Sequence, residues 1–327
     1  MARPGRYHLL YKAAAYPPAA VATAHPPPHH WKAAMGHIRI GISGWRYAGW
    51  RKVFYPDKLA QARELEFASR AVQTIEINGS FYSLQSPQRY ASWRDAAPPG
   101  FVFSVKASRY LTHTLRFRDA AASHAALANF FASGLFNLRE KLGPILWQFP
   151  PSFKFDDAAF EAILRQLPKD TDEAAALAAQ HDTHVRAPCV SAPRKRRLRH
   201  AIEVRHASFC DERFIKLLRK YHAALVISDS VADWPYAEDM TSDFVYMRLH
   251  GTQTLYGGKY SDSALDRWTA RIREWAAGRE PEDARRISRL RARRRAARDV
   301  FCYFDNDMKV QAPMDARRLM ERLDGKS

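Results

Sequence analysis

Eight short apolar runs recur along the chain, and nearly all of them end in polar or charged residues. The runs are RIGISGW, TIEINGSFY, FVFSVKASR, GPILWQFPP, HAIEVRH, AALVISDS, FVYMRLHG and DVFCYFDND. Runs that are apolar on both faces are typical of strands that lie buried in a parallel sheet. The pattern therefore predicts eight parallel strands.

Segments with apolar residues at helical spacing separate most of these runs, and several begin with Ser or Asp at the expected N-cap position. The segments are KLAQARELEFASRAV, SPQRYASWRDAAP, DAAASHAALANFFASGLFNLREKLG, DDAAFEAILRQLP, DERFIKLLRKYH, SDSALDRWTARIREWAAG and APMDARRLMERL. Only the link after the sixth run, VADWPYAEDMTSD, is doubtful as a full helix.

This alternation predicts an α/β fold, a TIM-type (β/α)8 barrel in a single domain, because parallel strands joined by right-handed helical crossovers close naturally after eight units. The competing arrangement is an open, doubly wound sheet. That fold usually carries a Gly-rich phosphate turn after its first strand, and GISGWRYAGW does not match GxGxxG. We therefore favour the barrel.

Composition separates the barrel from three added segments. Residues 1–35 are rich in Ala, Pro and His and have no helical or strand period, which predicts a disordered, basic N-terminal extension. Met35 precedes the first strand, so this segment is either an upstream extension of the reading frame or a dispensable tail. Residues 36–327 are the predicted barrel domain, with insertions at about 170–199 and 280–298. We expect the first insertion to be a loop and the second a solvated, Arg-rich arm.

The positive charge is concentrated in the same three segments. The chain carries a net charge of +18, and residues 1–35, 190–199 and 280–298 together supply fourteen of these charges. Clustered Arg attracts polyanions without sequence preference, so weak nucleic-acid contact through the basic insertions is one expectation. The remaining body has a charge that is ordinary for an enzyme.

Membrane and disulfide classes are disfavoured. No stretch approaches the roughly 20 apolar residues that a membrane-spanning helix needs. Cys189, Cys210 and Cys302 have no CxxC spacing and are odd in number, so neither a disulfide framework nor a structural zinc site is indicated. We expect a cytoplasmic protein without membrane contact.

In a parallel barrel the carboxyl ends of all strands surround one pocket, so polar residues at those ends should converge. The two-residue period places Glu76 with Asn78, Glu203 with Arg205, and Arg248 with His250 on one side of their strands. The predicted catalytic residues are Glu76, Glu203, His250 and Asp305. The predicted substrate-binding residues are Trp45, Asn78, Tyr82, Lys106, Gln148, Arg205, Asp229, Arg248, Tyr256 and Asn306.

The charges of this set suggest a ligand class. Lys106, Arg109, Arg205 and Arg248 suit a phosphate or carboxylate, and a solvated mouth avoids the cost of burying unpaired ions. The alternative is that each base only neutralises a nearby acid. His113 and His250 are the histidines placed for proton transfer, and a strand holds His250.

No cofactor is indicated by the residue pattern. Carboxylates on several strands, including Asp229 and Asp305, leave a magnesium or manganese site open as a hypothesis. No HxH, HxxxH or HExxH spacing supports it.

The chain resembles the YecE-like family, a family catalogued as domain of unknown function 72. The likeness runs from about Ile38 to Leu323. It rests on GISGWRYAGWRKVFYP, EINGSFY, FSVKASRYLTH, GPILWQFPP, EVRHASF, FVYMRLHG, LYGGKYSD and YFDND, which occur in family order. The resemblance implies a TIM-type barrel but no established reaction or cofactor. The basic insertions near Arg194 and Arg285 depart from the family's compact pattern.

These observations lead to a hypothesis with three rivals. We expect an enzyme that acts on a small polar, anionic or sugar-like substrate by general acid/base chemistry, with Glu76 and Glu203 as acid and base and His250 as proton shuttle. A divalent-metal-dependent hydrolase or isomerase is the second hypothesis. The third is a nucleic-acid-associated protein, and the fourth a metabolite sensor without turnover.

Overall fold

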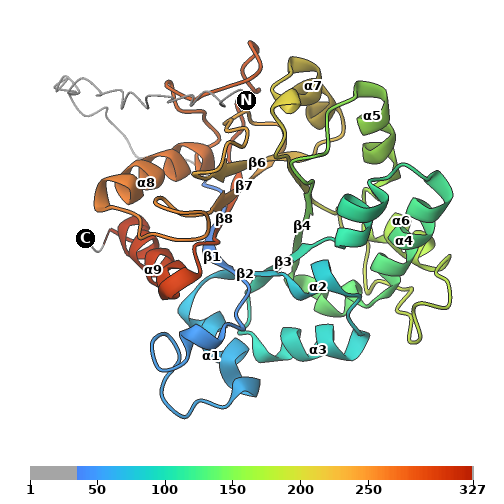
Figure 1. Cartoon of the computed structure of the whole chain (residues 1–327), viewed down its shortest axis with the longest axis horizontal. Coiled ribbons are helices and arrows are strands. Elements are labelled where there is room, and N and C mark those ends of the chain that lie inside the picture. The colour runs from blue at the N-terminus through green and yellow to red at the C-terminus, as the bar shows by residue number, and fades with distance from the viewer. Residues whose placement is uncertain (1–34, 326–327) are drawn as a thin grey trace, which may run out of the picture. The chain divides into compact units, whose positions relative to one another are not determined.

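A computed structural model describes residues 35–325, and the predicted disordered extension, except Met35, lies outside that range. Eight parallel strands form a closed barrel in chain order, and β8 pairs with β1 (Figure 1). The strands are β1 (Ile38–Ser43), β2 (Thr74–Ile77), β3 (Val102–Lys106), β4 (Leu142–Gln148), β5 (His200–Glu203), β6 (Ala224–Asp229), β7 (Phe244–Leu249) and β8 (Asp299–Phe304). The predicted (β/α)8 barrel is confirmed.

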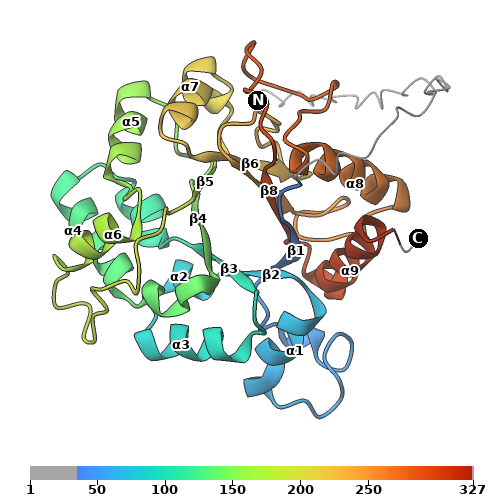
Figure 2. The same cartoon turned by 180° about the vertical axis from the view of Figure 1, so that it is seen from behind.

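Helices surround the barrel on its outside, as both views show (Figures 1 and 2). They are α1 (Glu64–Ala71), α2 (Gly79–Tyr82), α3 (Pro87–Ala96), α4 (Ala120–Ala132), α5 (Asp157–Gln166), α6 (Thr171–Ala178), α7 (Glu212–Lys220), α8 (Asp262–Ala276) and α9 (Gln311–Leu323). The expected caps are present: Ser86, Asp119, Asp156, Asp211 and Ser261 each accept a backbone N–H of the first helical turn. The segment between β6 and β7 contains no helix.

The barrel interior is filled by side chains from alternate strand positions. An apolar group at the centre includes Leu146, Val226 and Phe244. Above it two tyrosines are held by hydroxyl contacts: the Tyr246 hydroxyl lies 2.6 Å from Ser104 Oγ, and the Tyr303 hydroxyl lies 2.9 Å from Thr74 Oγ1. These buried tyrosines support the polar layer at the carboxyl ends of the strands.

The first insertion begins with a helix, so the prediction of a loop over 170–199 is wrong at its start. The Asp170 side chain accepts the backbone N–H groups of Asp172 and Glu173, which caps α6. Ala174 and Ala178 are buried on the face that packs against α4. The acidic, Ala-rich stretch therefore forms a short amphipathic helix, with a side-chain N-cap and one buried face.

The second insertion is attached to the barrel domain at its start and its end. Carboxylates of Glu238 and Asp239 accept the backbone N–H groups of Arg285, Ile287 and Ser288 at 2.6 to 3.0 Å. The prediction of a solvated arm is therefore wrong for residues 285–288, and also for the buried Arg298. The prediction holds for residues 289–295, nearly all of which are exposed.

No helix within residues 35–325 is long and apolar enough to cross a membrane.

Candidate active site

Side chains of opposite charge meet at the carboxyl ends of the barrel strands. The inward-facing residues there come from seven of the eight strands or from the positions that follow them: Ser43, Glu76, Lys106, Gln148, Glu203, Arg248 and Asp305. All are buried. The predicted convergence of polar residues at one end of the barrel is thus present in the structure.

Arg248 is the centre of this group, and its guanidinium is bound on every side. It donates to Glu76 Oε2 and Oε1 at 3.1 and 3.0 Å, to Glu203 Oε2 at 2.9 Å and to Asp305 Oδ2 at 2.9 Å. A further bond of 3.1 Å reaches Ser43 Oγ. Arg248 is 1 % exposed, so the guanidinium replaces its hydration shell with three carboxylates and a hydroxyl.

Further groups bind the carboxylates of this network. Arg205 donates to Glu203 Oε1 at 2.9 Å, and Tyr246 donates its hydroxyl to Glu76 Oε2 at 2.7 Å. Asp305 Oδ2 also lies 2.9 Å from His250 Nδ1. Both oxygens of Glu76 and of Glu203, and Oδ2 of Asp305, are thus hydrogen-bonded within the protein.

The electrostatics keep two of these acids ionised. Burial by itself raises the pKa of the Glu203 carboxyl, but Arg205 and Arg248 outweigh it and the pKa lies well below its usual range. The pKa of Asp305 is lowered in the same way, against burial, by Arg248 and by the bond from His250. The expectation of a solvated mouth is wrong for these groups, because Arg248 satisfies the acids.

Lys106 is the exception in this charged layer. Its ammonium makes no hydrogen bond or ion pair within residues 35–325, and it lies 4.2 Å from the centre of the Phe81 ring. Burial and, to a smaller extent, the positive charge of Arg248 lower the pKa of Lys106 to about 8, against the attraction of Glu76, Glu203 and Asp305. Lys106 therefore changes protonation near neutral pH.

His250 is held at one ring nitrogen and open at the other. Nδ1 contacts Asp305, whereas Nε2 has no hydrogen-bond partner in the described chain and lies 3.6 Å from Glu203 Oε1. The rings of Trp234 and Tyr256 lie edge-on to the imidazole, with centroids 5.2 and 5.7 Å away. A carboxylate on one nitrogen and a free second nitrogen is the arrangement that orients a histidine for proton transfer.

His113 lies at the edge of this layer, on a π-helical turn over Tyr110–Leu115. Its Nε2 is 3.3 Å from Gln148 Nε2. Burial, with smaller contributions from the positive charges of Lys106 and Arg205, lowers the pKa of His113 to about 4. His113 is consequently neutral at pH 7.

A hollow of about 580 Å³ opens beside the carboxyl ends of β1 and β2. Trp45, Tyr47, Asn78 and Tyr82 are among the residues that line it. Tyr82 is 70 % exposed, and Trp45 is buried against Trp93. Asn78 Nδ2 donates to Ser43 Oγ at 3.0 Å, so the hollow is joined to the Arg248 network.

Two predicted binding residues lie elsewhere. Asp229 follows Ser228, which is in register with Arg248, so alternation turns Asp229 toward the outside of the barrel, where it contacts Tyr260. Asn306 donates to the Gly258 carbonyl and to Asp315 Oδ2, both at 2.9 Å. Asp229 and Asn306 each follow a residue that faces the barrel interior, so both face outward. The two-residue period of a strand already implied this orientation.

The comparison with known proteins identifies the chain. The model for the protein of unknown function DUF72 matches residues 39–327. This chain belongs to the DUF72 family. The match covers all eight strands except the first residue of β1, and both insertions.

Solved DUF72 structures share the fold. A DUF72 family protein of Thermotoga maritima superposes with a TM-score of 0.65 at 22 % identity, covering 88 % of this chain and 99 % of the other. One from Enterococcus faecalis gives a TM-score of 0.62 at 18 % identity, covering 88 % of this chain and 95 % of the other. Likeness at these identities concerns the fold alone.

A curated relative is similar over a shorter region. The UPF0759 protein YunF of Bacillus subtilis (strain 168) is 31 % identical over 118 residues, which is 36 % of this chain. The matched part spans 41 % of the length of that relative.

The DUF72 barrel also contains site residues that sequence analysis missed. Tyr246 lies two positions before Arg248 and therefore on the same face, so the strand period could have revealed it. Trp234 stacks on Arg205, whose guanidinium carbon is 3.7 Å from the ring centre. Trp234 lies between β6 and β7, in a segment without helical or strand periodicity, so no local sequence pattern marks it. Asp307 is half-buried, and burial together with Asp305 raises its pKa to about 6.

The side chains that converge in the DUF72 barrel include three carboxylates, which are possible metal ligands. Within residues 35–325, no three His, Cys, Asp or Glu side chains are grouped so that they could hold a metal ion. Asp229 is turned away, and Glu76, Glu203 and Asp305 surround the Arg248 guanidinium. The cation that these carboxylates bind is thus part of the protein.

Proposed function

We propose that the barrel mouth is an enzyme site that transfers protons on a small anionic or sugar-like substrate. One observation supports this most strongly: Lys106 and His250, two groups able to move a proton, border the same Arg248 network. His250 Nε2 is buried without a hydrogen-bond partner in the described chain, and Lys106 has a lowered pKa. Titratable groups with such perturbed surroundings are enriched at functional sites.

Lys106 is the proposed base. With a pKa of about 8, roughly a tenth of its side chains are unprotonated at pH 7, and the remainder carry a charge that attracts an anionic substrate. Buried lysines with lowered pKa values serve as bases or nucleophiles for this reason.

His250 is the proposed second proton carrier. Asp305 holds Nδ1, which leaves Nε2 to face the substrate. This assignment changes the role expected for Glu76 and Glu203. Both carboxylates are occupied by Arg248, so they position the guanidinium and balance its charge and do not exchange protons themselves.

Substrate binding is assigned to the surroundings of these two groups. Arg205 and Lys106 supply positive charge, and stacking on Trp234 fixes the plane of the Arg205 guanidinium. Asn78 and Gln148 offer amides for hydroxyl groups, and the Oδ1 atom of Asn78 has no partner in the described chain. Trp45 and Tyr82 give the adjoining hollow an aromatic wall of the kind that packs against sugar rings.

The first test is a thermal-shift screen of the full chain against sugar phosphates, hydroxycarboxylates and divalent cations. A compound at about 100 times its dissociation constant adds roughly 2.7 kcal/mol to the free energy of unfolding. The shift caused by an anionic hit should disappear in Lys106→Met and remain in Lys216→Met, whose side chain is exposed on α7.

Turnover of that hit is the second test. We expect His250→Gln to bind the compound but to convert it at least about 100-fold more slowly, the usual contribution of a proton-transfer group. Full binding and full turnover in both Lys106→Met and His250→Gln would contradict the proposal.

A further inference from the structure

The amino-terminal end of the barrel, opposite the Arg248 network, is covered by an extended part of the first insertion. Residues 194–199 run beside the segment before α6: Thr171 donates its backbone N–H to the Arg196 carbonyl, and Leu198 donates to Lys169. The chain then enters β5 at His200. Side chains of this segment alternate between two sides, as in any extended chain.

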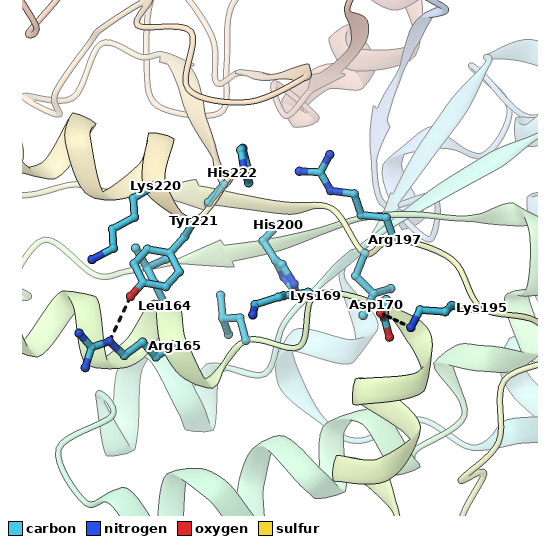
Figure 3. Close-up of a pocket in the computed structure, with 13 residues that line it drawn as sticks. Leu164, Arg165, Lys169, Asp170, Lys195, Arg197, His200, Lys220, Tyr221 and His222 are labelled. Carbon is cyan, nitrogen blue, oxygen red and sulfur yellow. Dashed lines mark hydrogen bonds and ion pairs between the residues drawn. The ribbon is translucent and has the colours of Figure 1, made fainter.

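A hollow with a volume of about 690 Å³ lies on one side of this segment (Figure 3). Its floor is apolar and includes Leu164, Leu167, Leu198 and Ala223. Basic side chains surround the floor, among them Lys169, Lys195, Arg197 and Lys220, as the close-up shows. The ring of Tyr221 forms part of the wall.

Two smaller hollows continue this one across the barrel end. The first, of about 340 Å³, shares Arg197 and Leu198 with the hollow of about 690 Å³. The other, of about 300 Å³, shares Leu142 and Arg196 with the hollow of about 340 Å³. Each hollow thus shares lining residues with the next along residues 194–199, and we call this row of three hollows the basal track.

Positive charge predominates along the basal track. Ten Lys and Arg side chains line its three hollows, against four carboxylates. Some of the cations are paired, for example Lys195 with Asp170 at 3.1 Å and Arg197 with Asp243 at 3.0 Å. Within residues 35–325, the side chains of Arg139, Lys169 and Arg194 are exposed and make no ion pair.

From this geometry we infer that the basal track binds single-stranded nucleic acid through its phosphates. A single strand alternates anionic phosphates with flat, largely apolar bases, and the track alternates cationic rims with apolar floors. Exposed cations without a partner release bound counterions when they meet phosphates, which favours association. An anionic membrane is flat and would not enter the hollows.

The site is separate from the proposed active site. The basal track includes Val102 and His200, the first residues of β3 and β5, whereas the mouth includes Lys106 and Glu203, the last residues of the same strands. The inference therefore does not depend on the enzyme proposal.

The test is the fluorescence anisotropy of a labelled 20-nucleotide single-stranded DNA of mixed sequence, titrated with the full chain at several salt concentrations. The triple variant Arg139→Glu, Lys169→Glu, Arg194→Glu should bind at least about tenfold more weakly in 0.1 M salt. The slope of log K against log salt should fall by about 2, since each lost phosphate contact removes about 0.7.

A matched control is available in the second insertion. Arg291, Arg293 and Arg294 are exposed and also make no ion pair within residues 35–325, so their replacement by Glu changes the net charge by the same amount. We expect this control to bind within about threefold of the parent protein. Circular dichroism and the Tm would verify that both variants are folded.

Three outcomes would overturn the inference. Equal loss in both triple variants would mean that net charge alone attracts the DNA. No loss in the basal-track variant would place the binding elsewhere. Tighter binding to vesicles containing phosphatidylserine than to the oligonucleotide, lost in the basal-track variant, would identify a membrane as the occupant.

Discussion

At the scale of single residues, the barrel mouth contains two buried cations in contrasting states. Arg248 exchanges its hydration for three carboxylates and a hydroxyl, while Lys106 loses most of its hydration and gains the face of Phe81. The first arrangement is stable as long as every member is present, and the second leaves the ammonium destabilised. Their substitution should therefore have opposite effects.

We expect Lys106→Met to be more stable than the parent protein at pH 7. The pKa of Lys106 is about 8 in the folded chain, below its ordinary value of 10.5, so burial of the charged form destabilises the fold below pH 8. This penalty disappears as the pH rises from about 8 to 10.5, because the unfolded chain then binds the proton and the folded chain does not.

Urea unfolding at pH 7 and at pH 10 checks this prediction. The difference between Lys106→Met and the parent should reach about 3 kcal/mol at the lower pH and shrink at the higher one. The same difference at both pH values would contradict the lowered pKa. Lys216→Met, on the exposed face of α7, is the control and should show no such trend.

Arg248→Met should have the opposite effect and lower the free energy of unfolding by about 3 to 5 kcal/mol at pH 7, since it leaves buried carboxylates without a counter-ion. Without Arg248 the pKa values of Glu203 and Asp305 should rise, so the loss should become smaller as the pH falls through 5 to 4. Denaturant unfolding over this range measures it. An undiminished loss at pH 4 would mean that packing, and not charge, is responsible.

At the scale of elements, the loop between β7 and α8 controls what covers His250. The backbone N–H of Tyr256 donates to the His250 carbonyl at 2.6 Å, which keeps the Tyr256 ring beside the imidazole. The loop can fold this tightly because Gly251 has a φ of +110°, and a Cβ there would lie 2.1 Å from the Gly257 carbonyl oxygen.

Gly251→Ala should consequently displace this loop and lower the Tm by several degrees, because a backbone clash and a left-handed φ each cost on the order of 1 to 3 kcal/mol. Any ligand found for the mouth should bind more weakly to this variant. Gly49→Ala is the control, since Gly49 has open space around it and should tolerate a methyl group. Equal Tm values for the two variants would show that the loop adapts at no cost.

At the scale of the whole barrel, the two ends differ in the burial and pairing of their charged side chains. The carboxyl end buries its charges in a compensated network, and the amino end exposes cations of which three, Arg139, Lys169 and Arg194, make no ion pair within residues 35–325. Strand β3 separates the two by four residues, or roughly 13 Å, which exceeds the range at which substitutions usually couple.

Lys106→Met and Lys169→Glu should therefore have additive effects on the free energy of unfolding, to within about 0.5 kcal/mol. Lys106→Met should also leave the oligonucleotide affinity within about twofold of the parent value. Urea unfolding of the two single variants and the double variant tests the first statement, and anisotropy tests the second. A larger coupling energy would show that the two ends communicate through the barrel.

The sequence determined the barrel and the convergence of its polar strand ends, because strand periodicity, caps and crossover handedness act locally and are visible in the residues themselves. It indicated which residues converge, including Glu76, Glu203, Arg248 and Asp305. It did not indicate which of them form ion pairs. Only the tertiary structure decided that Arg248 saturates these acids while Lys106 remains unpartnered, since pairing depends on distances between strands that spacing along the chain does not contain. The orientation of Asp229 and the ordered start of the second insertion were decided in the same way, by contacts between distant segments.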